Sequence, residues 1–562
     1  MQINTSVKLY LFLKNKLFSM RFLILIILVG CFSSFSISQK DKKPPKLVIG
    51  IVIDQMCYEY LYRYKAKFSD SGFVKLMNEG TNCRNTQYNY VPTYTGPGHA
   101  SIYTGTTPAN HGIIANQWYI KHEGKSLNCV GDSKAKTVGS ESENGKCSPH
   151  NLFSNTITDQ LKLTYKEAKV ISVSLKDRSA ILPGGHLSDG SYWFDKSTGD
   201  FITSDFYKAT LPKWVMDFNQ VNYPEKTMEK QWETLYPLAS YTESDKDNSP
   251  YEVVFPGKKT PTFPYDLDLI PKNKQFNYFT YTPYANTFLT DFALQSIRSE
   301  QMGMDLTTDF LCISYSSTDI LGHAFGPYSV EIEDMYLRLD KEVARLIQTL
   351  ESTVGKDDFI LFLTADHAVV PVPQYLTDKN LPGGYLNLGF NIEALNSELK
   401  EVFGAPLIQS YLNNNIYLDD KTMSLLAIDK LDVVRLIQKK IQSWEGVKAV
   451  YNSSDLQSLD LKSEWAEMVQ QGYVFERSGD LIFILHPGYL TKDKDVQGVG
   501  TSHGSAFNYD THVPLLWYGK GIPRQEIFRR INITDIAATL TYFLNVQRPN
   551  ATTGEPILEV LD

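Results

Sequence analysis

The chain is poor in cysteine and has no excess of positive charge. Its 562 residues include six cysteines, none of them in a Cys-x-x-Cys pair, so we do not expect a zinc site built from cysteines. The net charge is −8, which argues against a nucleic-acid partner bound through a basic surface. There is no internal repeat and no long low-complexity tract. The composition, 42% hydrophobic and 12% aromatic, is that of a globular protein.

The N-terminal segment is predicted to direct the protein out of the cytoplasm. Basic residues precede the apolar run 22–29, which is too short to span a membrane as a helix, and no second run is a candidate span. Two interpretations remain open. A signal peptide 1–38 cleaved after Ser38 would release the chain, whereas a lipoprotein signal ending at residue 30 would leave a lipid anchor on Cys31. We favour release and expect a periplasmic or secreted protein.

Short apolar runs of strand composition alternate with helical patterns along the rest of the chain. Apolar residues at spacings of three and four predict a helix over 332–350, and the cap candidates Asn532 and Thr534 predict a helix over 535–544. This alternation predicts an α/β fold, a three-layer α/β/α sandwich with a mostly parallel central sheet. The predicted strands are 47–53, 170–175, 310–315, 359–365, 480–485 and 513–518.

One catalytic domain is expected, covering residues 39–562. The alternation of strands and helices breaks at about 188–286 and at about 370–477, and we interpret both segments as insertions. In an oxidising compartment Cys129 and Cys147 could form a disulfide across the polar loop between them. Cys312 lies in an apolar run and is expected in the core.

Residue types that bind metals occur where predicted strands end and where glycine-containing loops begin. The run 47–53 stops at an aspartate, and the run 359–365 stops at Asp366. Ligands bind at the carboxyl ends of parallel strands, so these side chains are expected to meet. Three aspartates and three histidines suit two zinc ions with mixed oxygen and nitrogen ligands. They are Asp54, Asp319, His323, Asp366, His367 and His503.

Each of these residues alone has an ordinary structural explanation. Asp319 and His323 are four residues apart and share a face only if the backbone there is helical. His99 and His111 are expected to pack or hydrogen-bond rather than bind metal. His512 is left open between a supporting role and a competing ligand.

Thr95 is the candidate nucleophile. It precedes Gly-Pro-Gly-His, a segment that favours a helix start, and a helix N-terminus attracts anions. A threonine hydroxyl becomes a useful nucleophile when a metal lowers its pKa. The alternative is an ordinary helix cap, for which Thr93 also competes.

Three further side chains are candidates for holding an anion. Lys176 and Arg178 follow the strand 170–175 and would share a face if the chain stays extended. An exposed basic loop is the alternative. Asn116 could donate an amide hydrogen bond to an oxygen of the anion.

These residues occur in the order of the alkaline phosphatase superfamily. From residue 46 to 557 the chain resembles the type I phosphodiesterase/nucleotide pyrophosphatase family, and within it the threonine-nucleophile, phosphate-irrepressible bacterial alkaline phosphatases. The resemblance implies one zinc held by Asp319, His323 and His503. It implies a second zinc held by Asp54, Asp366 and His367 with Thr95. It also implies that Asn116, Lys176 and Arg178 contact the phosphoryl group.

The resemblance further implies a zinc-dependent phosphomonoesterase with a covalent phosphothreonine intermediate. The Lys-x-Arg pair resembles the monoesterases of the family, because a monoester dianion carries one more anionic oxygen than a diester. The alternative is a phosphodiesterase or nucleotide pyrophosphatase on the same site. We expect small-molecule phosphate monoesters as substrates and a monomeric protein.

Overall fold

The computed structural model describes residues 43–457, 463–492 and 498–561. The signal segment predicted over 1–38, with Cys31 and Ser38, lies outside the described residues. Contacts divide the chain into Met1–Pro44 and Pro45–Asp562, and every element named below belongs to the second unit. Among the helices of the described stretches, none combines the length and the apolar character needed to cross a membrane.

A large sheet forms the centre of this unit. Its strand order is β20-β2-β19-β12-β1-β11-β6-β7-β8-β5, with β21 paired to β2. The five strands from β12 to β7 are parallel, whereas β19 and β8, which flank them, are antiparallel to their neighbours. The parallel strands are β12 (Phe359–Thr364), β1 (Leu47–Ile53), β11 (Asp309–Tyr315), β6 (Val170–Ser174) and β7 (Gly190–Phe194). The others are β20 (Gln525–Ile527), β2 (Thr81–Gln87), β19 (His512–Gly519), β8 (Phe201–Ser204), β5 (Thr137–Val138) and β21 (Ile531–Asn532).

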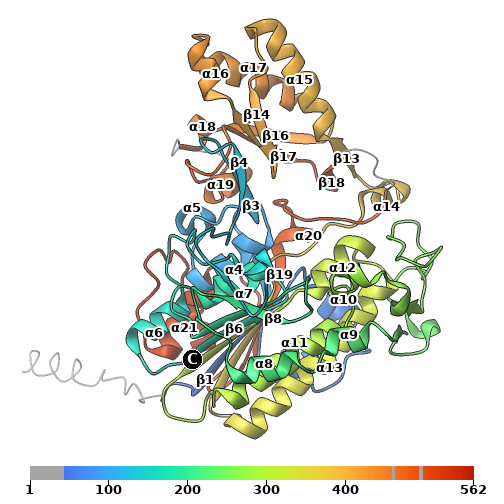
Figure 1. Ribbon diagram of the computed structural model, residues 1–562, viewed down its shortest axis with the longest axis vertical. Coiled ribbons are helices and arrows are strands. Elements are labelled where there is room, and N and C mark those ends of the chain that lie inside the picture. Colours follow the sequence, from blue (N-terminus) through green and yellow to red (C-terminus); the bar gives the residue numbers. More distant parts are fainter. Residues whose placement is uncertain (1–42, 458–462, 493–497, 562) are drawn as a thin grey trace, which may run out of the picture. The chain divides into compact units, whose positions relative to one another are not determined.

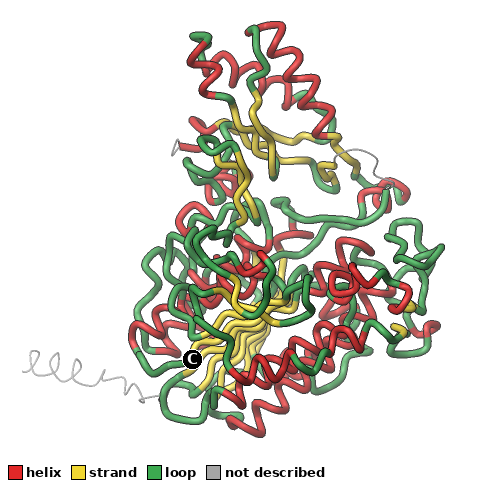
Figure 2. Tube along the Cα trace, in the orientation of Figure 1, coloured by secondary structure: helices red, strands yellow, loops and turns green. Residues whose placement is uncertain are grey.

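Helices cover both faces of this sheet (Figures 1 and 2). Side chains alternate between the faces of a strand. On β11, the Cys312 Sγ lies 3.9 Å from the Pro183 carbonyl oxygen of α7, whereas the Tyr315 hydroxyl, on the other face, lies 2.9 Å from the Thr290 hydroxyl of α11. The predicted α/β class and mostly parallel sheet are therefore confirmed. The covering helices include α4 (Thr95–Thr104), α7 (Asp177–Gly184), α11 (Tyr284–Ser299), α13 (Val330–Leu350) and α21 (Asp535–Leu544).

The apolar runs of the sequence form the buried strands at the centre of the sheet. Every residue of β1 and β12 is buried, as expected for strands covered on both faces. The predicted helix over 332–350 is α13, which begins two residues earlier, where the Ser329 hydroxyl accepts a hydrogen bond from the Ile332 N–H. The predicted helix over 535–544 is α21.

A second, four-stranded sheet has its own apolar core. Its order is β14-β15-β17-β16, and α17 (Lys430–Gln442) packs against it. The strand predicted at 480–485 is present as β17, but it belongs to this sheet and not to the central one. We propose that this sheet and its helices form the second of the two insertions, which then extends beyond the expected end at about 477 to include β17. Its strands are β14 (Ile408–Leu412), β15 (Asn415–Leu418), β17 (Leu481–Leu485) and β16 (Val447–Asn452).

The suggested disulfide between Cys129 and Cys147 is not formed. All five cysteines of the described residues are buried free thiols. The Cys147 Sγ instead faces the Asn144 carbonyl oxygen at 3.8 Å and the Asp177 carboxylate at 3.7 Å. Cys312 is a core residue, as expected.

Candidate metal centre

Three carboxylates leave the central sheet at the carboxyl ends of adjacent parallel strands. β1 lies between β11 and β12. Asp54 directly follows β1, and Asp366 comes two residues after β12. Asp319 lies in the first turn of α12 (Ser317–Phe325), the helix that follows β11. The strand order therefore brings together residues that are more than 300 positions apart.

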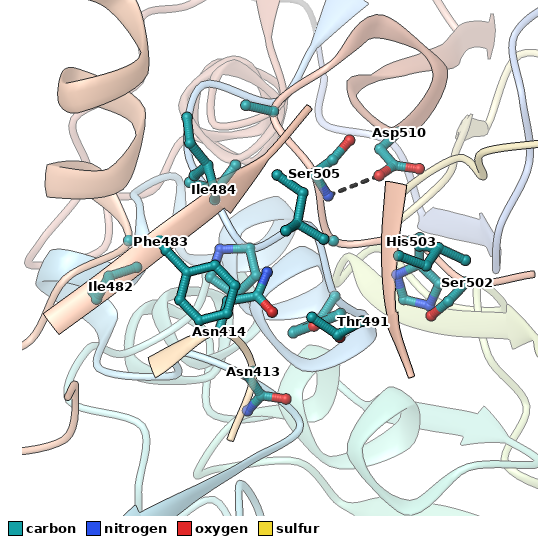
Figure 3. A pocket seen from close by; sticks show the side chains of 18 of the residues that line it. Asn413, Asn414, Ile482, Phe483, Ile484, Thr491, Ser502, His503, Ser505 and Asp510 are labelled. Carbon is teal, nitrogen blue, oxygen red and sulfur yellow. Dashed lines mark hydrogen bonds between the residues drawn. The ribbon is translucent and has the colours of Figure 1, made fainter. Parts of the chain in front are cut away.

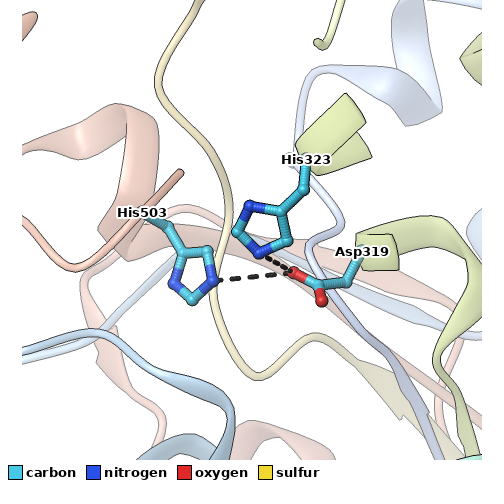
Figure 4. A group of neighbouring side chains, drawn as sticks. All are labelled: Asp319, His323 and His503. Carbon is cyan, nitrogen blue, oxygen red and sulfur yellow. Dashed lines mark ion pairs between the residues drawn. The ribbon is translucent and has the colours of Figure 1, made fainter. Parts of the chain in front are cut away.

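The six predicted ligands form two groups, and within each group the ligand atoms lie within 4.8 Å of one another. The first group is Asp319, His323 and His503 (Figure 4); the Asp319 Oδ1 lies 3.2 Å from His323 Nε2 and 3.5 Å from His503 Nε2. The second group is Asp54, Asp366 and His367. The His367 Nε2 lies 3.4 Å from Asp54 Oδ1 and 3.6 Å from Asp366 Oδ2. The groups adjoin, since the His367 and His503 rings stack with centroids 3.4 Å apart.

The three histidines are oriented in the same way. Each ring places Nδ1 against a backbone carbonyl oxygen, which can only accept a hydrogen bond, so Nδ1 carries the hydrogen and donates it. The Nε2 lone pair of each ring then faces the carboxylates, as in metal-ligating histidines. The acceptors are Thr501 for His323 at 2.8 Å, Thr93 for His503 at 2.7 Å and Ala368 for His367 at 3.0 Å.

The second group holds buried negative charge that its neighbours only partly satisfy. Asp54 Oδ1 and Asp366 Oδ2 are buried and have no hydrogen-bond partner among the described residues. Burial and the Asp54 charge raise the pKa of Asp366. Burial and Asp319 act in the same direction on Asp54, but Lys176 and His367 outweigh them and lower the pKa of Asp54 to about 2. Orphaned carboxylate oxygens beside imidazole nitrogens fit a divalent metal such as zinc.

Thr95 lies beside the second group. Its hydroxyl oxygen is 3.4 Å from His367 Nε2, and its side chain is buried. Thr95 is the first residue of α4, and the N-cap residue is Tyr94, so neither Thr95 nor Thr93 is the cap. The Gly96 N–H donates to Asn116 Oδ1 at 2.7 Å, which leaves the Asn116 amide group to donate elsewhere.

Lys176 links the two groups. Its Nζ lies 2.6 Å from Asp54 Oδ2 and 2.6 Å from Asp319 Oδ2, and its side chain is only 9% exposed, which argues against an exposed basic loop. The predicted extended alternation is wrong, because α7 begins at Asp177 and places Arg178 in its first turn. Lys176 and Arg178 nevertheless line one cavity of about 640 Å³. Arg178 and Asn116 also line a second cavity, of about 420 Å³.

Gln55 belongs to the site, and sequence reasoning missed it. Its backbone φ of 65° is in the left-handed region, which is rare for a residue with a side chain. Its N–H donates to Asp366 Oδ1 at 3.2 Å, and its Nε2 donates to Asp319 Oδ1 at 2.7 Å. A Cβ on Gly322 would lie 1.9 Å from Gln55 Oε1. The only sequence signal is that Gln55 directly follows Asp54.

The remaining histidines lie outside the two groups. The His99 ring places Nδ1 2.9 Å from the Thr95 carbonyl oxygen and Nε2 2.8 Å from the Ser314 hydroxyl, a hydrogen-bonding role as expected. His512 stacks on Tyr58 with ring centroids 4.5 Å apart, and its Nε2 lies 3.1 Å from the Arg84 carbonyl oxygen. It is therefore not a competing ligand in this structure.

The loop that carries His503 borders a cavity of about 90 Å³ (Figure 3). On one side the cavity is lined by β17 residues, among them Phe483. In the loop, the Ser505 N–H donates to Asp510 Oδ2 at 2.7 Å, and burial raises the pKa of Asp510 to about 7. The Thr501 hydroxyl donates to the Val370 carbonyl at 2.6 Å. These hydrogen bonds anchor the loop on both sides of the candidate ligand His503.

Known proteins are similar to this chain over most of its length. The chain is 41% identical over 521 residues to the alkaline phosphatase PafA of Elizabethkingia meningoseptica, covering 92% of this chain and 94% of that protein. It is 40% identical over 537 residues to a Myroides odoratus protein named a calcium-transporting ATPase, covering 95% and 98%.

Solved structures are also similar to this chain in fold and sequence. The crystal structure of wild-type PafA superposes with a TM-score of 0.88 at 39% identity, covering 92% of this chain and 99% of that one. Another structure of PafA is a variant with a substituted threonine, asparagine, lysine and arginine. The family model of the type I phosphodiesterases and nucleotide pyrophosphatases matches residues 48–506. The chain belongs to the type I phosphodiesterase/nucleotide pyrophosphatase family.

Proposed function

We propose that this protein is a zinc-dependent phosphomonoesterase, an alkaline phosphatase that releases inorganic phosphate through a covalent phosphothreonine. The observation that carries the proposal is the position of Lys176, whose ammonium group joins both ligand groups while the Thr95 hydroxyl lies beside one of them. The similarity to PafA supports it, since that relative is an alkaline phosphatase.

Two zinc ions are proposed, one held by each group. Asp319, His323 and His503 would hold the first. The second would be held by Asp54, Asp366 and His367, with the Thr95 hydroxyl as a further ligand. Bound zinc lowers the pKa of a coordinated hydroxyl and stabilises negative charge on the oxygens that enter and leave.

The chain's own residues position and hold the phosphoryl group. In the first step the deprotonated Thr95 oxygen forms a bond to phosphorus, the bond to the ester oxygen breaks, and the leaving alcohol takes up a proton. Lys176, Arg178 and the Asn116 amide group hold the non-bridging oxygens. In the second step a water oxygen attacks phosphorus from the vacated side, the threonine oxygen leaves and regains a proton, and phosphate departs. Positioning and charge stabilisation supply most of the rate enhancement.

The alternative function is phosphodiester or nucleotide pyrophosphate hydrolysis on the same site. A monoester dianion places one more anionic oxygen near Lys176 and Arg178 than a diester does, so the two cations favour monoesters. ATP belongs among the test substrates because one relative is named an ATPase.

One experiment tests both parts of the proposal. Metal content is measured on the purified protein, and hydrolysis of p-nitrophenyl phosphate, bis(p-nitrophenyl) phosphate and ATP is compared. About two zinc ions per chain and a strong monoester preference are expected. A strong preference for the diester would instead establish the alternative, a phosphodiesterase or nucleotide pyrophosphatase. Failure to recover activity when zinc is restored after dialysis would rule out both the phosphomonoesterase and this alternative.

We propose a periplasmic or secreted monomer, released by cleavage after Ser38 rather than anchored through Cys31. The mass of the mature N-terminus distinguishes the two processing routes, and light scattering on the purified enzyme gives its oligomeric state.

A further inference from the structure

We propose that the cavity of about 640 Å³ lined by Lys176 and Arg178 receives the leaving group, and that Lys196 forms a second anion-binding site in it. The preferred substrates would then be phosphate monoesters whose leaving group carries another negative charge, a carboxylate or a second phosphate. This inference rests on the proposed phosphatase function and narrows it to a substrate class.

The fold places Lys196 beside the phosphoryl-binding residues. β6 and β7 are parallel neighbours, and Ser174 pairs with Trp193 at their carboxyl ends. Lys176 follows Ser174 by two residues, and Lys196 follows Trp193 by three. Both lysines therefore leave the sheet at the same edge, and both line the cavity of about 640 Å³ that also contains Arg178.

The other cations of this cavity have carboxylate partners. Lys176 contacts Asp54 and Asp319, as described above. Arg178 lies 3.5 Å from the Asp177 carboxylate, and Lys146 forms an ion pair with Glu143. Among the described residues, the Lys196 ammonium group contacts the neutral Asn277 side chain, with Nζ 3.2 Å from Oδ1.

The carboxylate of the adjacent residue, Asp195, already has other hydrogen-bond partners. It accepts hydrogen bonds from the Ser140 and Ser142 hydroxyls and from the Asn144 amide group, each at 2.7 Å, and from the Ser197 N–H at 2.8 Å. These contacts pin the loop around Asn144 against the turn that follows β7. The hydrogen bonds of the Asp195 carboxylate thus hold the cavity wall in place, and this carboxylate does not pair with Lys196.

Lys196 also lies in the field of Lys176 and Arg178. Its side chain is exposed, yet partial burial and the charges of these two cations outweigh the carboxylates of Asp177 and Asp319 and lower the pKa of Lys196 to about 8. An anion bound between these groups would relieve their repulsion. Lys196 thus offers a partner for a second negative charge in the cavity that Lys176 and Arg178 also line.

The rest of the cavity suits a small carbon skeleton. Its lining includes the residues Trp193, Phe194, Tyr281 and Ile320. The Trp193 indole N–H donates to the Asn144 carbonyl oxygen at 3.0 Å, which fixes this wall. A leaving group with a short apolar part and a terminal anion matches these apolar residues and the Lys196 ammonium group.

The test compares two substrates with the same three-carbon skeleton, glycerol 3-phosphate and 3-phosphoglycerate. In wild-type enzyme kcat/KM should be higher for 3-phosphoglycerate. Lys196→Met should reduce kcat/KM for 3-phosphoglycerate about tenfold, mainly through KM, as expected when one hydrogen bond to a charged group is lost. For glycerol 3-phosphate the change should stay within about twofold.

Two variants serve as controls. Lys196→Arg should keep the preference for 3-phosphoglycerate, because it keeps the charge. Lys272→Met removes an exposed positive charge outside the cavity and should leave both substrates unaffected. An unchanged substrate ratio in Lys196→Met, or an equal loss on both substrates, would overturn the second site while leaving the phosphatase intact. Wild-type enzyme inactive on every monoester would instead overturn the proposed function.

Discussion

Gly98 lies directly against Asp366. A Cβ on Gly98 would lie 2.3 Å from the Asp366 carbonyl oxygen, so the first turn of α4, which begins with Thr95, packs on the loop that carries the proposed ligand Asp366. The clash is with backbone and cannot be relieved by rotating a side chain. Gly98→Ala should therefore displace Thr95 relative to the second group. A loss of turnover of about 10²-fold is expected from a displacement of this kind. Turnover of p-nitrophenyl phosphate near the wild-type level would show that the packing is looser than the structure indicates.

Thr95→Ala should reduce kcat by at least ~10³-fold, because a catalytic unit is broken when its nucleophile is removed. Thr95→Ser keeps a hydroxyl at the same position and should retain measurable turnover. Rapid quenching of the wild-type reaction followed by peptide mass spectrometry should find phosphate on Thr95. Near-normal turnover in the alanine variant would rule out this residue as the nucleophile.

Lys176→Ala should harm monoesters more than diesters. The ammonium group would neutralise the additional charge of a monoester dianion, and a diester lacks that charge. The ratio of kcat/KM for p-nitrophenyl phosphate over its bis ester should fall by at least about tenfold. Zinc content must be measured in parallel, since Lys176 also contacts Asp54 and Asp319. An unchanged ratio with full zinc content would remove Lys176 from the phosphoryl site.

Gln55→Asn should weaken metal binding. Asparagine tolerates the left-handed backbone at this position, but its shorter side chain cannot reach Asp319. Loss of a residue that orients a metal ligand typically costs 10–100-fold, so we expect zinc affinity to fall by about that factor. Competition with a chelator measures the affinity, and Gln220→Asn, at an exposed position, is the control. Equal affinity in the two variants would leave Gln55 with a purely structural role.

His111 should make the protein less stable in acid. Burial, with Arg477 nearby, lowers the pKa of His111 from 6.5 to about 3. Between these values the unfolded chain binds a proton that the folded protein does not, so the free energy of unfolding falls by about 1.4 kcal/mol for each pH unit of acidification below 6.5. His111→Gln removes this dependence.

Urea unfolding measures the effect. From about pH 7.5 to about pH 5, wild type should lose about 2 kcal/mol more than the variant, because only the region below 6.5 contributes. Parallel pH dependence of the two proteins would show that His111 is not the group responsible.

The sequence was informative where a chemical role coincides with the end of a strand. Asp54 and Asp366 could be placed together because parallel strands present their carboxyl ends at one edge of a sheet. The role of Gln55 could not be predicted from the sequence, because it depends on a left-handed backbone conformation that a glutamine does not indicate. The position of Lys196 near Lys176 depends on β7 lying beside β6, and the order of strands in a sheet cannot be predicted from the local sequence pattern. The extended path expected for Lys176 and Arg178 failed because α7 begins at once after β6.

The ligand groups draw on nearly the whole length of the polypeptide, from Asp54 after the first strand to His503 near its end. Such a centre cannot be completed on a partly synthesised chain, because its last imidazole arrives only when some nine-tenths of the residues are available. Binding of the proposed zinc ions would therefore be a late event in folding, and the amount of bound metal would measure how much of a preparation has finished folding.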